Sequence, residues 1–129
     1  MTDWAAPPSG GEVVVYEAPG GEVRVDVRLE RETVWLSQQQ MADLFGRERS
    51  VVTKHIRNAY QEGELDPGAT SAKLAQVRSE GGRAVSREVD HYNLDVIISV
   101  GYRVKSLRGM QFRIWATRTL RGHLLAGIR

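Results

Sequence analysis

Hydrophobic and polar residues alternate along the first part of the chain. In residues 23–29 aliphatic side chains alternate with charged ones, and a β-branched run precedes them at residues 12–17. Alternation with a period of two is typical of a strand with one buried face. Because the sequence PGG separates the two runs, the pattern predicts an N-terminal β-hairpin, followed by a short strand at residues 33–36.

The spacing of the apolar residues then becomes helical. Ser37 followed three residues later by Gln40 is the sequence of a capping box, in which two side chains bond free backbone N–H groups at the start of a helix. We expect a helix from there to Phe45, ended by Gly46, because glycine is often found just after a helix.

A second helix is expected to begin near Ser50, a good N-cap residue, and to end at Gly63. Two helices joined by a short turn that contains glycine predict a helix-turn-helix. The residues expected to pack this pair against the rest of the domain are Met41, Ala42, Phe45, Val52 and Ile56.

The remaining chain predicts a second hairpin and two more helices. Residues 62–72 are expected to form a loop, and residues 73–92 two thinly buried strands around a Glu-Gly-Gly tip. Asn93 is expected to cap an apolar helix, and a longer helix is expected near Leu107–Ala126. Residues 1–11, rich in Pro, Gly and Ser, are expected to be a disordered lead-in.

This order of elements predicts a single α+β domain over residues 12–129. The predicted fold is a winged helix-turn-helix with an N-terminal β-hairpin and two C-terminal helices. The second hairpin is then the wing, with Arg78 and Arg83 placed to reach a DNA backbone, although Glu80 at its tip repels phosphate. The alternative is a hairpin that only closes the small sheet.

The formal net charge of +2 conceals a gradient along the chain. Residues 1–36 have a balance of −4 and residues 37–95 a balance of −1, whereas residues 96–129 hold seven basic residues and no acidic one. An all-basic segment of this length indicates an anionic partner, either a nucleic acid or the acidic face of another protein. The alternative is a cationic helical surface without a partner.

The outward positions of the predicted second helix are basic or carry hydroxyl groups. In a helix-turn-helix, the N-terminal part of the second helix lies near the base edges of the major groove. Arginine can bond guanine through two hydrogen bonds, whereas lysine and hydroxyl side chains suit phosphates. The candidate DNA-binding residues are Arg47, Arg49, Ser50, Thr53, Lys54, Arg57, Arg78 and Arg83. The alternative is a pair of amphipathic helices with a solvated basic face.

Other classes of function find no support in the sequence. The chain has no cysteine and its three histidines are scattered, so no disulfide, metal site or cofactor is expected. The sequence contains no recognisable nucleophile–histidine pair and no phosphate-binding glycine loop, so we do not expect an enzyme. The lack of a long apolar run and of a signal peptide predicts a cytoplasmic location without membrane association.

Three segments of the sequence carry a family resemblance: VVVYEAPGGEVRVDVRLE, ETVWLSQQQMADLFGRERSVVTKHIRNAYQEGEL and HYNLDVIISVGYRVKSLRGMQFRIWATRTL. With these segments, which span roughly residues 12–126, the chain resembles the RhuM family of bacterial virulence-associated proteins. That family is similar to the Bro-N and KilA-N type domains of phage and viral regulators, so the resemblance implies DNA binding. It also implies that the chain is the N-terminal domain of a longer protein.

Two hypotheses about function follow. The first is double-stranded DNA binding by a transcriptional regulator or antirepressor-like module, with residues 50–62 in the major groove. The second is a protein-interaction or targeting domain of a larger virulence effector, because one fold can serve several functions. We also expect a homodimer through the C-terminal helix, since a two-fold dimer would double the phosphate contacts.

Overall fold

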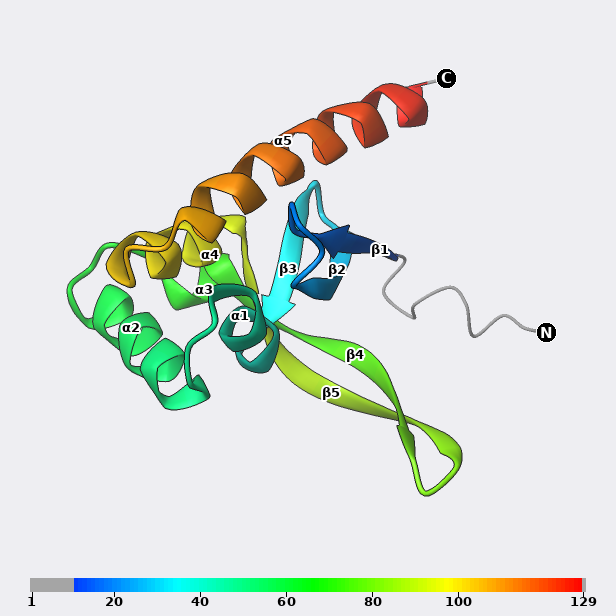
Figure 1. The fold of residues 1–129 in the computed structure, drawn as a ribbon, viewed down its shortest axis with the longest axis horizontal. Helices are drawn as coiled ribbons and strands as arrows, with labels where there is room; N and C mark the ends of the chain where they lie inside the picture. Colours follow the sequence, from blue (N-terminus) through cyan, green and yellow to red (C-terminus); the bar gives the residue numbers. More distant parts are fainter. Residues whose placement is uncertain (1–10, 129) are drawn as a thin grey trace.

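The computed structural model describes residues 11–128, and the side chains of residues 11–123 (Figure 1). The strands are β1 (Glu12–Glu17), β2 (Arg24–Glu30), β3 (Thr33–Ser37), β4 (Ser71–Glu80) and β5 (Arg83–Asn93). The helices are α1 (Gln38–Phe45), α2 (Arg49–Gln61), α3 (Pro67–Thr70), α4 (Leu94–Arg103) and α5 (Leu107–Ile128). Apart from Gly11, the predicted disordered lead-in lies outside the described residues.

The strands form one antiparallel sheet in the order β1-β2-β3-β5-β4. The predicted N-terminal hairpin is confirmed, with Val14 opposite Val27 in the β1–β2 register. The connection between the two hairpins is made by β3 and β5, where Leu36 lies opposite Tyr92. Beyond this short pairing, β4 and β5 continue alone as a long hairpin (Figure 1).

One face of the sheet packs against the helices, and the hydrophobic core lies between them. The alternation predicted for β2 is confirmed, because Val25, Val27 and Leu29 are buried in this core. Tyr16 of β1 meets Phe112 and Trp115 of α5 edge-on, with ring centroids 5.1 and 5.0 Å away. Such aromatic contacts hold α5 across the first strand of the sheet.

Helix α1 begins and ends as the sequence predicted. Gln40 N–H donates to Ser37 Oγ at 3.2 Å, and Ser37 N–H donates to Gln40 Oε1 at 2.8 Å, which completes the capping box. Gly46 follows the helix at φ 65°, a left-handed conformation that glycine adopts without a Cβ clash.

Two boundaries differ from the prediction. Helix α2 begins one residue before Ser50, and its N-cap is Glu48, whose side chain makes no capping bond. The segment predicted as loop contains the short helix α3, because Asp66 accepts a bond from Ala69 N–H and Pro67 occupies the first helical position. The Asn93 cap of α4 is confirmed by its bonds from the N–H groups of Asp95 and Val96.

Helices α4 and α5 approach each other very closely at two glycines. A Cβ atom on Gly101 would lie 3.1 Å from the Cα of Gly109 and 3.2 Å from the ring of Phe45. The helices therefore touch backbone to backbone above the C-terminal end of α1. This contact fixes α5 relative to the α1–α2 pair.

The predicted winged helix-turn-helix is wrong as a description of the fold. The second hairpin is not a separate wing, because β5 bonds to β3 and so joins the N-terminal hairpin in a single five-stranded sheet. Periodicity shows which face of a strand is buried but not which distant strand pairs with it. The pairing of β3 with β5 therefore has no local signal in the sequence. The α+β class, the N-terminal hairpin and the two C-terminal helices are confirmed.

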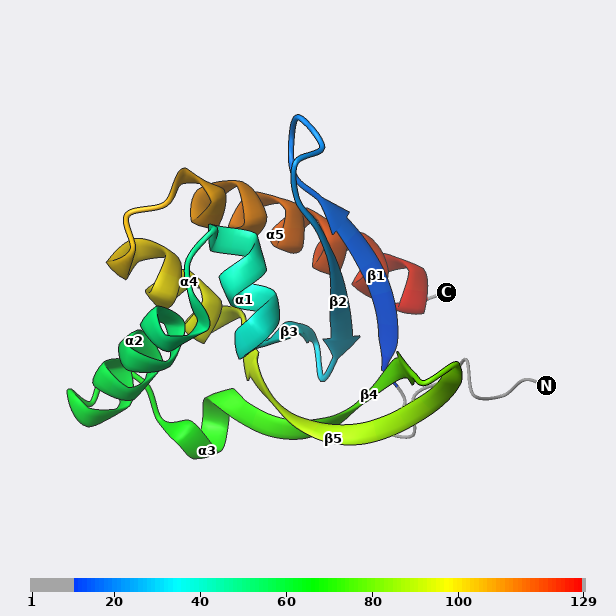
Figure 2. The same ribbon diagram turned by 60° about the horizontal axis from the view of Figure 1, so that its bottom comes forward.

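The second hairpin has two parts. Its base closes the sheet, as the alternative interpretation expected, with residues 71 and 72 of β4 beside β5 where β5 meets β3. Its outer part, residues 73–90, extends past the sheet and is called the arm below (Figures 1 and 2). Most of its side chains are exposed or half-buried, as expected for a thinly buried hairpin.

Candidate nucleic-acid interface

Helix α2 presents a basic row opposite its buried face. Its buried residues are Val52, Ile56 and Ala59, which face the core. Ser50, Lys54 and Arg57 follow one another at spacings of four and three, so they lie in one line on the exposed side of the helix. Within the described part of the chain, the side chains of Lys54 and Arg57 form no hydrogen bond or ion pair, which leaves both charges available.

Arg47 is exposed, and its guanidinium group is bonded to backbone carbonyls of the protein, while its contact with DNA stays a prediction. Its Nη1 donates to the carbonyl oxygen of Phe45 at 3.1 Å, and its Nη2 donates to that of Val104 at 2.9 Å. Both acceptors are backbone groups near helix ends, where carbonyl oxygens lack helical partners. Arg47 thus ties the turn after α1 to the end of α4.

Thr53 is also engaged within the protein. Its hydroxyl donates to Gln38 Oε1 at 2.5 Å, and Gln38 Nε2 donates in turn to the Tyr92 hydroxyl at 3.1 Å. This chain of bonds connects α2, the start of α1 and β5. Thr53 therefore positions α2 on the sheet, and its hydroxyl proton is already used.

The arm carries two arginines without a local partner. Arg78 and Arg83 are exposed, and their side chains make no hydrogen bond or ion pair with any other described residue. Glu80 beside the tip is bonded twice by Arg87, at 2.8 and 3.1 Å, and this bonding lowers the pKa of the Glu80 carboxyl. The tip carboxylate, which would repel phosphate, is thus compensated by an arginine of the same hairpin.

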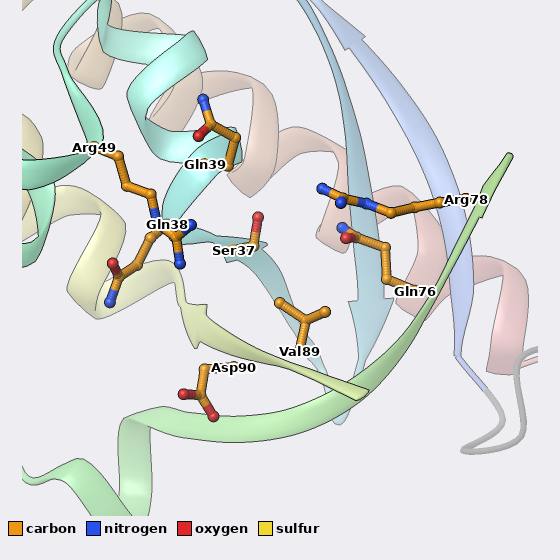
Figure 3. Close-up of a pocket in the computed structure, with 8 residues that line it drawn as sticks. All are labelled: Ser37, Gln38, Gln39, Arg49, Gln76, Arg78, Val89 and Asp90. Carbon is orange, nitrogen blue, oxygen red and sulfur yellow. The ribbon is translucent and has the colours of Figure 1, made fainter. Parts of the chain in front are cut away.

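A hollow of about 230 Å³ lies between the start of α1, the start of α2 and the arm (Figure 3). Arg49 enters it from α2 and Arg78 from β4, and both side chains extend toward the same space (Figure 3). Asp90 also lines the hollow, but its carboxylate is paired with Lys73 at 2.8 Å. The fold thus brings together two predicted cations that are far apart in the sequence.

Three glutamines of this hollow were missed by sequence reasoning. Gln38, Gln39 and Gln76 line it with amide groups, which can both donate and accept hydrogen bonds. The run of three glutamines at the start of α1 was a signal, but only the capping role of Gln40 was read from it. Gln76 lies on the arm, and nothing local in the sequence points to its place beside α1.

The basic C-terminal segment lies elsewhere. Figure 1 shows α5 on the side of the molecule opposite the arm. Arg103 is held by Glu62 at 2.8 Å and by Glu64 at 2.7 Å, and Arg108 donates to the Leu44 carbonyl at 3.2 Å. Part of the predicted cationic surface is therefore structural, and the candidate interface consists of α2 and the arm.

No metal centre accompanies this interface in the described residues, where no cluster of three or more His, Asp or Glu side chains is arranged to hold an ion. Among the same residues, no helix has the length and apolar character needed to cross a bilayer.

Comparison with known proteins concerns the second half of the chain. Residues 69–129 match the model of the Virulence protein RhuM family. This segment belongs to the RhuM family. No curated protein and no solved structure matches the chain. The predicted RhuM resemblance is confirmed by this match, whereas similarity to the Bro-N and KilA-N type domains stays a prediction.

The RhuM segment holds one side of the candidate interface. It includes the arm, with Arg78 and Arg83, and the helices α4 and α5. It also supplies the Val104 carbonyl that anchors Arg47. The other side of the interface, α2 with its basic row, precedes the matched residues.

Proposed function

We propose that this domain binds double-stranded DNA through α2 and the arm together. The observation that carries the proposal is the meeting of Arg49 and Arg78 at one hollow. These two guanidinium groups have no partner among the described side chains and repel each other, and a phosphate between them removes that repulsion while accepting hydrogen bonds from both.

The dimensions of the two elements suit a duplex. Helix α2 is roughly 20 Å long at 1.5 Å per residue, enough to follow a major groove that is about 12 Å wide. The arm extends roughly 25 Å at the rise of a β-strand, enough to reach from the helix to a neighbouring backbone. The row of Ser50, Lys54 and Arg57 then serves phosphates, and the amide of Gln76 in the hollow suits base edges or sugars.

Fluorescence anisotropy with a labelled duplex tests the proposal. The double variant Arg49→Ala/Arg78→Ala is expected to bind at least about tenfold more weakly than the parent, since each phosphate contact contributes on the order of 1 kcal/mol. The matched control is Arg113→Ala/Arg118→Ala, which removes the same charge from α5, on the opposite side. Equal weakening by both pairs would show that only net charge matters and would refute the α2–arm interface.

The predicted role in transcription regulation requires sequence preference as well. Selection from a pool of random duplexes, followed by sequencing of the bound fraction, measures it. We expect enrichment of a short site, because side-chain contacts to base edges discriminate between bases. Binding without enrichment would restrict the function to non-specific DNA binding.

A further inference from the structure

Helix α5 carries an apolar stripe that no other described part of the chain covers. Leu107 is 74 % exposed, Met110 53 % and Ile114 43 %. Their spacings of three and four place them in one line, on the side of the helix away from the buried Phe112 and Ala116. A line of large aliphatic side chains in water is typical of a surface that binds another protein.

Basic residues continue this stripe along the same line. Arg118 stands four residues after Ile114 and Arg121 stands three residues after that, while Arg113 lies to one side. All three are exposed, and residues 96–129 contain no Asp or Glu. The surface therefore offers an apolar end and a cationic end within one helix face.

We propose that this stripe is a docking surface for an acidic amphipathic helix of another protein. Apolar side chains at i, i+3 and i+7 of the partner would cover Leu107, Met110 and Ile114. Carboxylates further along the same face would meet Arg118 and Arg121. A second copy of this chain fits less well, because parallel packing of α5 on α5 brings the two cationic ends together, and antiparallel packing sets each cationic end against the apolar end of the other copy.

The surface is separate from the proposed DNA interface. Helix α5 lies across the sheet on the side opposite the arm, so both partners can be held at once (Figure 1). The proposal is independent of DNA binding. A domain that binds DNA through α2 and the arm and a protein through α5 would act as an adaptor.

Selection from a displayed library of helix-forming peptides on the purified full chain tests the proposal. We expect enriched peptides to be rich in Asp and Glu and to bind Met110→Asp/Ile114→Asp at least about tenfold more weakly than the parent. Both substitutions are at exposed positions, so the fold is retained, which circular dichroism checks. The matched control is Val13→Asp, an exposed aliphatic residue of β1, which should bind the peptides like the parent.

A charge exchange distinguishes the acidic partner from a merely apolar one. Arg118→Glu should weaken the enriched peptide, and replacing its carboxylates by lysine should restore binding to that variant. The Arg49→Ala/Arg78→Ala protein should bind the peptide normally even if it has lost DNA, so the two proposals fail separately. The proposal is overturned if no peptide is enriched, if the enriched peptides lack acidic residues, or if the parent instead forms a dimer that Met110→Asp/Ile114→Asp dissociates.

Discussion

Arg47 Nη2 donates a 2.9 Å hydrogen bond to the carbonyl oxygen of Val104, which joins the turn after α1 to the end of α4. Arg47, which the sequence predicts as a DNA contact, thus also helps to position these two elements. Arg47→Ala is expected to lower the free energy of unfolding by about 1–2 kcal/mol, because it leaves the carbonyls of Phe45, Gly46 and Val104 without a charged donor. Urea denaturation of the purified protein measures this loss.

Arg57→Ala is the control variant for Arg47→Ala. Arg57 is exposed on α2, and its side chain forms no hydrogen bond or ion pair within the described part of the chain, so its removal should leave the unfolding midpoint within the error of the parent. It should instead weaken binding to duplex DNA. If Arg47→Ala weakened DNA binding with no change in stability, the positioning role would be wrong.

The close contact of α4 and α5 predicts an unusual sensitivity to a single methyl group. Gly101→Ala puts a Cβ 3.1 Å from the Cα of Gly109, where neither backbone can yield without separating the helices. We expect a net loss of about 1–2 kcal/mol, since overpacking outweighs the gain in helix propensity. Thermal unfolding followed by circular dichroism measures it.

Gly122→Ala is the matched control for that substitution. Gly122 lies in α5, the helix that Gly101 of α4 touches at Gly109, and a Cβ at Gly122 meets nothing within 4 Å. Only helix propensity then acts, so this variant should be stabilised by up to about 1 kcal/mol. Equal effects of the two glycine substitutions would contradict the close helix crossing.

The turn between β2 and β3 holds two non-glycine residues in a strained backbone conformation, which a glycine substitution can relieve. Arg31 and Glu32 both adopt positive φ, of 56° and 62°, in a two-residue hairpin connection that glycine or asparagine usually occupies. Glu32→Gly should therefore raise the free energy of unfolding by about 1 kcal/mol. The same change at Glu88, within β5, should lower it, since glycine weakens a regular strand.

Stability should decrease in mild acid. The pKa of His91 lies below its ordinary value of 6.5, mainly because the imidazole is buried. Because the folded state then binds fewer protons than the unfolded state, the free energy of unfolding falls as the pH drops through about 6.5 toward the lower folded-state pKa. Burial also lowers the pKa of His55, which adds a contribution of the same sign.

Urea midpoints measured from pH 8 to pH 5 test this dependence. His91→Asn should flatten the profile over this range, and His55→Asn together with His91→Asn should flatten it further. A profile of His91→Asn that ran parallel to the parent would show that the buried imidazole is not the source.

Local features of this protein were predictable from the sequence, whereas the pairing of distant elements was not. The Ser37–Gln40 capping box, the Gly46 end of α1 and the Asn93 cap each depend on a few adjacent residues, and all three are confirmed. The pairing of β3 with β5 depends on residues far apart in the chain, so the fold was assigned to the wrong architecture.

The candidate site shows the same division. Exposure of Lys54 and Arg57 follows from helical spacing within α2. The use of Arg47 and Thr53 inside the protein depends on acceptors contributed by Val104 and Gln38, which helical spacing cannot reveal. Likewise, only the curvature of the second hairpin brings its residues to the start of α1 (Figure 2).

The salt dependence of duplex binding tests the central claim most directly. Each phosphate contact releases condensed counterions and adds about 0.9 to the steepness of log affinity against log salt concentration. We predict that Arg49→Ala/Arg78→Ala reduces the steepness of this slope by about 1.8, the contribution of two phosphate contacts. Arg113→Ala/Arg118→Ala should leave the slope unchanged. An Arg49→Ala/Arg78→Ala slope equal to that of the parent, or no binding by the parent at low salt, would contradict DNA binding by α2 and the arm.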